Sequence, residues 1–334
     1  MENTETRHEE DRQAVEQIAA SREKIEQELG RVIIGQKAAV EEILVTLFAG
    51  GNCLITGVPG LAKTLMVRAI AGIFDLGFHR IQFTPDLMPA DITGTEVLSE
   101  TEEGRRMAFV HGPVFANIIL ADEINRTPPK TQAALLESMQ EYQVTAAGER
   151  HPLEKPFFVL ATQNPIEMEG TYPLPEAQLD RFMFNVVIDY LPEDDEVAVV
   201  TQTTGGASKP IEALFSGEDV LRFNELVRKV PIAEDLTRYA VQLAAASRPH
   251  REGAPKFVND WVSWGAGLRA AQFLSLGAKA RTLLQGRAHV TPEDIQALAA
   301  PVLRHRVLVN YRAEAEGISA EGVIDRLLEE VPAP

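Results

Sequence analysis

Residues 57–64 read Gly-Val-Pro-Gly-Leu-Ala-Lys-Thr and lie between an apolar stretch and an amphipathic one. A glycine-rich turn that joins a strand to a helix lets backbone N–H groups point at phosphate oxygens. In such a loop Lys63 would neutralise the β- and γ-phosphates of a nucleotide, and the Thr64 hydroxyl would bind Mg²⁺. We assign phosphate binding to this loop and to the first residue of the helix that follows: Gly57, Val58, Pro59, Gly60, Leu61, Ala62, Lys63, Thr64 and Leu65.

One residue of this loop departs from the usual pattern. Glycine normally stands directly before the lysine, whereas this sequence has Ala62. We expect Ala62 to become helical, so that its methyl group is a small perturbation. The alternative interpretation is an ordinary Gly/Pro turn with a solvated lysine.

Two carboxylates follow a second apolar stretch, residues 118–121. Charged side chains at the end of a buried strand need a partner, because an unpaired buried charge is costly. Asp122 would hold the metal ion through water, and Glu123 would orient and deprotonate an attacking water. The alternative is a strand that simply ends in solvent.

Three further polar residues are candidates for the same chemistry. Asn164 follows another apolar stretch and could hydrogen-bond the attacking water or the γ-phosphate, although Asn-Pro also favours a plain turn. Arg181 and Arg269 could each stabilise phosphate charge in a transition state, because a guanidinium is planar and always protonated. A structural ion pair is the alternative for either arginine, and spacing alone does not choose between the two.

The elements that must position these residues alternate between strands and helices. The strands are predicted at residues 52–56, 80–83, 117–121, 157–162 and 183–188. This alternation predicts an α/β fold with a mostly parallel sheet covered by helices. Residues 95–110 and 143–153 interrupt the pattern as two inserted hairpins, and an amphipathic first helix ends at Gly30.

The chain is long enough for two domains. We expect a disordered tail over residues 1–11, an α/β core over 12–191 and a small all-α unit over 192–334. Thr291 and Pro292 mark a helix start within the last unit.

Composition excludes several classes of protein. The net charge of −17, from 49 acidic and 32 basic residues, argues against a broad nucleic-acid surface, although a local basic patch would not show in this total. No apolar run is long enough to span a membrane, and the polar N-terminus does not resemble a secretory signal. The single cysteine, Cys53, excludes an internal disulfide, and no His or Cys pair has zinc-ligand spacing. We interpret the protein as cytoplasmic.

The sequence resembles the MoxR family of AAA+ ATPases over roughly residues 12–330. The resemblance lies in residues 32–36, 57–64, 83–91, 112–115, 121–126 and 173–182, with a weaker match at 290–294. Alanine before the lysine is usual in this family, which removes the doubt about Ala62.

This resemblance implies a P-loop AAA+ core with a five-stranded parallel sheet, a helical lid and a hexameric ring. It implies that Ile33, Ile34 and Gly35 contact adenine, that Asn164 is sensor 1, and that Arg181 is an arginine finger for the neighbouring subunit. Arg269 would be sensor 2, and the two hairpins would be the helix-2 insert and the pre-sensor-1 hairpin facing the pore. The family usually has Gly-Ala-Ser-Pro-Arg at sensor 2, whereas residues 265–269 read Gly-Ala-Gly-Leu-Arg, so the aim of this arginine is in doubt.

The resemblance implies an ATPase that uses ATP and Mg²⁺ to remodel or activate a client protein. Such proteins usually work with a partner that carries a von Willebrand A domain, often to insert a metal or cofactor. The alternatives are a magnesium-chelatase-like motor subunit, a nucleic-acid motor and a scaffold that does not hydrolyse ATP. The charge disfavours the nucleic-acid motor, and a scaffold would need neither Glu123 nor Asn164.

Overall fold

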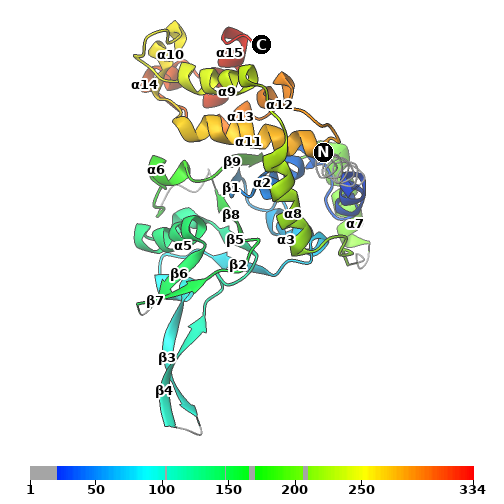
Figure 1. Ribbon diagram of the computed structural model, residues 1–334, viewed down its shortest axis with the longest axis vertical. Coiled ribbons are helices and arrows are strands. Elements are labelled where there is room, and N and C mark those ends of the chain that lie inside the picture. Colours follow the sequence, from blue (N-terminus) through cyan, green and yellow to red (C-terminus); the bar gives the residue numbers. More distant parts are fainter. Residues whose placement is uncertain (1–20, 102–103, 147, 165–169, 206–209) are drawn as a thin grey trace, which may run out of the picture.

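The computed structural model describes residues 21–101, 104–146, 148–164, 170–205 and 210–334 (Figure 1). The predicted disordered tail and the first turns of the predicted N-terminal helix lie outside these residues. Residues 21–30 are helical, and the helix ends at Gly30 as predicted.

A five-stranded parallel sheet forms the centre of the core, which confirms the predicted fold class. Its strand order is β2-β5-β8-β1-β9. The strands are β1 (Cys53–Gly57), β2 (Phe78–Gln82), β5 (Ile118–Asp122), β8 (Phe158–Gln163) and β9 (Phe184–Ile188). The predicted bounds are correct to within one or two residues.

Both faces of this sheet are buried, which explains why its strands are almost continuously apolar. Cys53 and Ile55 of β1 belong to one buried cluster, whereas Leu54 between them belongs to another. The first cluster includes α2 (Lys37–Ala49) and α3 (Lys63–Ile73) and continues into the lid. The second includes α5 (Pro129–Glu141). Short helices α4 (Pro89–Thr93), η1 (Ile124–Arg126) and α6 (Glu176–Leu179) complete the core.

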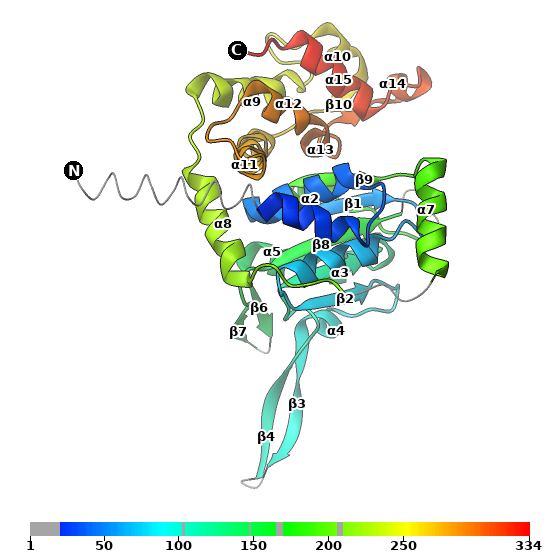
Figure 2. The same cartoon turned by 90° about the vertical axis from the view of Figure 1, so that its right-hand side faces the viewer.

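Both predicted inserts are antiparallel hairpins. Strands β3 (Gly94–Thr101) and β4 (Gly104–His111) form a long ribbon that projects away from the core (Figure 2). The shorter hairpin is formed by β6 (Gln143–Ala146) and β7 (Glu149–Pro152). Phe109 of the long hairpin stacks on His151 of the short one with ring centroids 3.9 Å apart, so the bases of the two hairpins are in contact.

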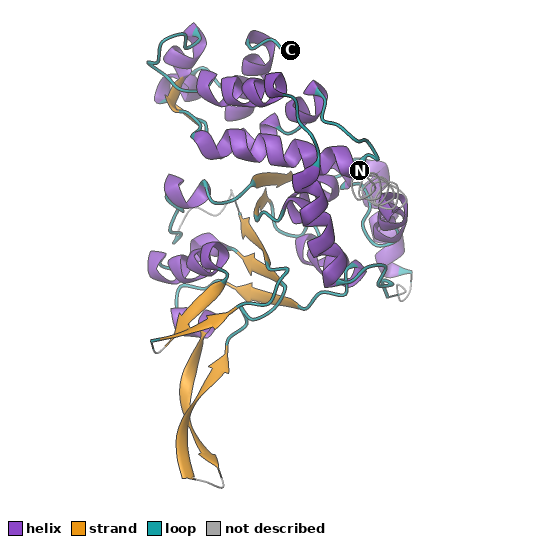
Figure 3. Ribbon diagram, viewed as in Figure 1, coloured by secondary structure: helices purple, strands orange, loops and turns teal. Residues whose placement is uncertain are grey.

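The C-terminal part is helical, as predicted; its helices from residue 234 on gather at the end of the molecule opposite the long hairpin, whereas the two before them lie beside the core (Figure 3). Its helices are α7 (Glu193–Thr204), α8 (Gly217–Lys229), α9 (Glu234–Ala246), α10 (Lys256–Trp261), α11 (Leu268–Leu284), α12 (Pro292–Ala297), α13 (Ala299–Leu303), α14 (Tyr311–Ala315) and α15 (Ala320–Glu330). It also contains one short antiparallel pair, β10 (Val262–Trp264) with β11 (Leu308–Val309), where only helices were expected.

The predicted domain boundary after residue 191 stays a prediction. The side chain of Asn224 in α8 donates hydrogen bonds to the carbonyls of Leu47 and Phe48 in α2, at 2.9 and 2.8 Å. Helix α8 also contacts α11, so it packs against both parts. Within the described residues, no helix is long and apolar enough to cross a membrane.

Candidate functional site

The phosphate-loop candidate joins β1 to α3, as predicted, but its helix begins at Lys63 rather than at Leu65. Ala62 is not helical: it has φ 55° and ψ 22°, in the left-handed region. The prediction that Ala62 enters the helix was therefore wrong, and its Cβ carries a strain of about 1–2 kcal/mol there. Gly60, with φ 86°, has the left-handed conformation at no such cost.

The first and last residues of the loop are held close together. A Cβ on Gly57 would lie 2.3 Å from the carbonyl oxygen of Ile188, so only glycine fits between β1 and β9. The Lys63 ammonium donates a hydrogen bond to the Gly57 carbonyl at 2.5 Å. Burial lowers the pKa of Lys63, while the negative charges of Asp122 and Glu123 oppose this effect. In the structure, the predicted phosphate-binding lysine is therefore close enough to both predicted carboxylates to interact with them electrostatically.

Both carboxylate oxygens of Asp122, the last residue of β5, are held by neighbouring strands. Thr162 of β8 donates its hydroxyl hydrogen to Oδ1 at 2.6 Å. Arg80 of β2 donates to Oδ2 from Nη2 at 2.6 Å and from Nε at 3.0 Å. The carboxylate of Asp122 is thus fixed in orientation from both sides.

Glu123 has a left-handed backbone, with φ 57° and ψ 49°. Its N–H donates to the Thr162 hydroxyl at 2.8 Å. Its Oε2 accepts a hydrogen bond from Gln82 at 2.9 Å and lies 3.1 Å from Nε of Arg126. The backbone turn and these two donors set the direction of the carboxylate.

Asn164 directly follows β8 and is 6% exposed. Strand β8 lies between β1 and β5, pairing Thr56 with Gln163 and Ala121 with Ala161. Asn164 therefore leaves the sheet between the phosphate loop and the two carboxylates, as a residue that contacts the γ-phosphate should. The Pro165 side of the predicted turn lies outside the described residues.

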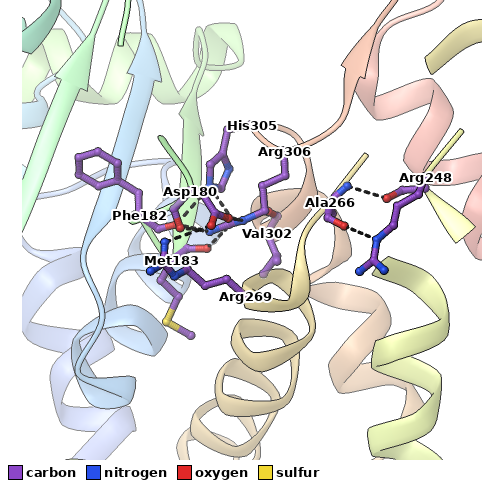
Figure 4. A network of polar contacts seen from close by, with 10 residues as sticks. Asp180, Phe182, Met183, Arg248, Ala266, Arg269, Val302, His305 and Arg306 are labelled. Carbon is purple, nitrogen blue, oxygen red and sulfur yellow. Dashed lines mark hydrogen bonds and ion pairs between the residues drawn. The ribbon is translucent and has the colours of Figure 1, made fainter. Parts of the chain in front are cut away.

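Arg181 belongs to the segment 180–183, where the core meets the lid, and Arg269 contacts the same segment (Figure 4). Arg181 donates to the Leu136 carbonyl of α5 at 3.2 Å. Arg269 of α11 donates to Asp180 Oδ2 at 3.1 Å. Arg306, which follows α13, donates to Asp180 Oδ1 at 2.8 Å and to the Phe182 carbonyl at 2.6 Å.

Comparison with known proteins identifies the family. The profile of the ATPase family associated with various cellular activities (AAA) matches residues 52–184, and that of the AAA lid domain matches residues 258–327. Chaperone MoxR1 of Mycobacterium tuberculosis is 42% identical over 92% of this chain and 81% of its own length. The chain belongs to the MoxR family of AAA+ ATPases.

Two further proteins are similar to this chain over most of its length. The uncharacterised protein YeaC of Bacillus subtilis is 40% identical over 92% of both chains. The crystal structure of a proposed ATPase from Cytophaga hutchinsonii has a TM-score of 0.91 and 42% identity, and the match covers 99% of both chains. These matches confirm the AAA+ core with a helical lid.

The adenine contacts implied by the MoxR family stay predictions. Ile33 is half-buried against the main core. A Cβ on Gly35, which has φ 76°, would meet the Leu191 side chain at 2.6 Å and Asp195 at 2.7 Å. Ile34 lies between these two constrained positions. Gly35 therefore lies against the start of α7, where a larger residue would not fit.

Four residues of this candidate site had no role predicted from the sequence, namely Arg80, Gln82, Arg126 and Thr162. Thr162 is the last residue of the predicted strand 157–162, two residues before Asn164, and polar residues at a strand end could have been the signal. Arg80 and Gln82 would have been found only with the knowledge that β2 pairs with β5, which places Gln82 opposite Asp122.

Proposed function

We propose that this protein binds ATP with Mg²⁺ on residues 57–65 and hydrolyses it. The observation that carries the proposal is the position of Lys63, half-buried and within electrostatic reach of both Asp122 and Glu123. A cation and two carboxylates beside a strand-to-helix turn are the groups that phosphoryl transfer to water requires. A plain structural turn would not need them together.

The residues present fit a magnesium ion. Thr64 offers a hydroxyl in the first turn of α3, and Asp122 offers a carboxylate at the end of β5. Hard oxygen ligands of this kind are those Mg²⁺ prefers. When bound, the ion would neutralise charge on the β- and γ-phosphates.

Residues of the chain would bind the phosphates and activate the attacking water. Backbone N–H groups at the start of α3 and the Lys63 ammonium would hold the phosphates. Glu123 would accept the proton of the attacking water, because its carboxylate is aimed by Gln82 and Arg126. Asn164 would hydrogen-bond the same water or the γ-phosphate.

We further propose a homo-hexameric ring in the cytoplasm, in which Arg181 completes the site of the next subunit. In a ring each interface is heterologous, so one subunit can supply a residue to the nucleotide of its neighbour. The role of Arg269 as sensor 2 on its own subunit's nucleotide receives no support from its ion pair with Asp180, and it stays a prediction.

The work done by hydrolysis would be remodelling or activation of a client protein. The name of MoxR1, a chaperone, supports this class of activity. A von Willebrand A domain partner and metal or cofactor insertion stay expectations from the family resemblance. A magnesium-chelatase-like subunit differs only in its partner, and the net charge of −17 disfavours a nucleic-acid motor.

Substitution of Glu123 tests the proposed reaction. Glu123→Gln is nearly isosteric but cannot accept a proton, so it should bind ATP normally and release phosphate at least about 100-fold more slowly than wild type. Phosphate release and the affinity for a fluorescent ATP analogue are measured side by side. Glu329→Gln, at an exposed position on α15, is the matched control and should behave as wild type. Hydrolysis at the normal rate by Glu123→Gln would remove Glu123 from the role of base.

A further inference from the structure

We propose that Thr162 is a positioning residue for ATP hydrolysis. It would hold Asp122, the proposed magnesium ligand, and Glu123, the proposed general base, in a fixed orientation relative to each other. The inference rests on the proposed function of Asp122 and Glu123. Thr162 lies in β8 and is 1% exposed, so its hydroxyl has only protein partners available at this edge of the sheet.

The hydrogen bonds of this hydroxyl can be assigned without ambiguity. It contacts Asp122 Oδ1 at 2.6 Å and the N–H of Glu123 at 2.8 Å. A hydroxyl has one hydrogen, and an ionised carboxylate can only accept. The hydrogen therefore points to Asp122, and an oxygen lone pair accepts the Glu123 N–H.

The contact lies where the regular sheet stops. The ladder between β5 and β8 ends with Ala121 opposite Ala161. Beyond that pair the chain turns into the left-handed conformation of Glu123, and its N–H no longer meets a strand carbonyl. The Thr162 side chain supplies the partner that the backbone would otherwise provide.

Removal of the hydroxyl should loosen both carboxylates together. Asp122 would keep only Arg80, which holds its other oxygen. The N–H of Glu123 would lose its partner, and the left-handed conformation would lose a group that favours it over ordinary backbone angles. Neither change touches the phosphate loop, so nucleotide binding should survive.

Thr162→Val tests this because it keeps the branched shape and removes only the hydroxyl. We expect kcat to fall about 10- to 100-fold, which is the worth of one hydrogen bond to a charged group. The affinity for an ATP analogue should stay within about 3-fold of wild type, and the Mg²⁺ concentration for half-maximal rate should rise. Thr162→Ser restores the hydroxyl and should recover most of kcat.

The matched control is Thr46→Val. Thr46 is fully buried in α2, and its hydroxyl bonds the Glu42 carbonyl, away from the two acids. This variant should keep the wild-type kcat and Mg²⁺ dependence. It shows what the loss of a buried threonine hydroxyl does when no catalytic group depends on it.

The outcomes separate the inference from the function on which it rests. A wild-type protein that releases no phosphate contradicts the proposed function itself. With an active wild type and an inactive Glu123→Gln, a Thr162→Val rate within about 2-fold of wild type overturns the positioning role. If Thr162→Val does not fold, Thr162→Cys replaces it and is compared with Thr162→Ser, because both lack the methyl branch and a thiol donates only weakly. If ATP affinity falls together with kcat, if serine fails to rescue, or if neither replacement folds, the hydroxyl serves the fold and the inference is wrong.

Discussion

Replacement of Arg306 should destabilise the whole protein, because this lid residue is bonded to the core along one short segment. Arg306 is 5% exposed. It donates to the carboxylate and the carbonyl of Asp180, at 2.8 and 2.9 Å, and to the carbonyls of Phe182 and Val302, at 2.6 and 2.5 Å. Burial lowers the pKa of its guanidinium to about 10, so it remains charged at neutral pH.

The size of the effect follows from what Arg306→Met leaves behind. Loss of one partner from a buried ion pair costs about 3–5 kcal/mol. Asp180 is 31% exposed and keeps Arg269 at 3.1 Å. The cost of leaving Asp180 without Arg306 therefore lies at the lower end of this range. The carbonyls that lose a donor add about 1 kcal/mol each when water cannot reach them. With about 3 kcal/mol for the ion pair and about 1 kcal/mol for each of one to three carbonyls, we expect a loss of about 4–6 kcal/mol, which lowers the melting temperature by roughly 6–9 °C.

Thermal unfolding followed by circular dichroism measures this loss. Arg306→Lys should lie between wild type and methionine, because an ammonium keeps the charge but cannot reach all of the acceptors. Arg238→Met is the control: Arg238 pairs with Glu234 on an exposed helix face, and such pairs contribute little. A melting temperature for Arg306→Met within about 2 °C of wild type would refute the view that this residue joins lid and core.

Three further predictions concern nucleotide binding, pH and the ring. Lys63→Ala should weaken ATP binding about 10- to 100-fold without lowering the melting temperature, since it removes a charged contact and opens no cavity; an unchanged affinity in a nucleotide titration would contradict the phosphate-loop assignment. Burial raises the pKa of Glu42 to about 7, so this acid binds more protons folded than unfolded, and its contribution to stability is lost as pH rises from about 4.5 to 7. Glu42→Gln should therefore stabilise the fold by about 2 kcal/mol more at pH 8 than at pH 5, and an equal gain at both pH values in thermal melts would be evidence against burial as the cause. Arg181→Ala and Glu123→Gln should each be inactive alone but regain part of the rate when mixed, because one can donate an arginine to the intact site of the other; no recovery after proven subunit exchange would place Arg181 in its own subunit's site.

The strands could be predicted, and the candidate site residues could be expected to lie together, because their signals are local. A strand of a parallel sheet is apolar on both faces, so each one stands out in the sequence. The phosphate loop and the Asp122–Glu123 pair follow two such strands. The carboxyl ends of parallel strands meet at one edge, which brings these motifs together without knowledge of any other contact.

The residues that orient the two carboxylates could not be predicted, because their positions depend on strand order and backbone conformation. Nothing in the sequence says that β2 lies beside β5, and this pairing alone brings Arg80 and Gln82 to the carboxylates. The left-handed angles of Ala62 and Glu123 are equally hidden, because both residues normally have negative φ. The tertiary contact between the Glu123 N–H and the Thr162 hydroxyl accompanies one of these conformations, and the sequence does not reveal it.

The direction in which Arg269 points could not be predicted from the sequence either, because it depends on how two domains pack. Its motif predicts a lid helix that points at the nucleotide, but where the helix points depends on how the lid sits on the core. Arg306, which belongs to no recognised motif, fixes this by bonding the carbonyls on either side of Arg181 through a single nitrogen, Nη2. The lid cannot rotate against residues 180–182 without breaking both bonds. We therefore expect a change in lid orientation either to break these two bonds or to move the backbone of Arg181 with the lid.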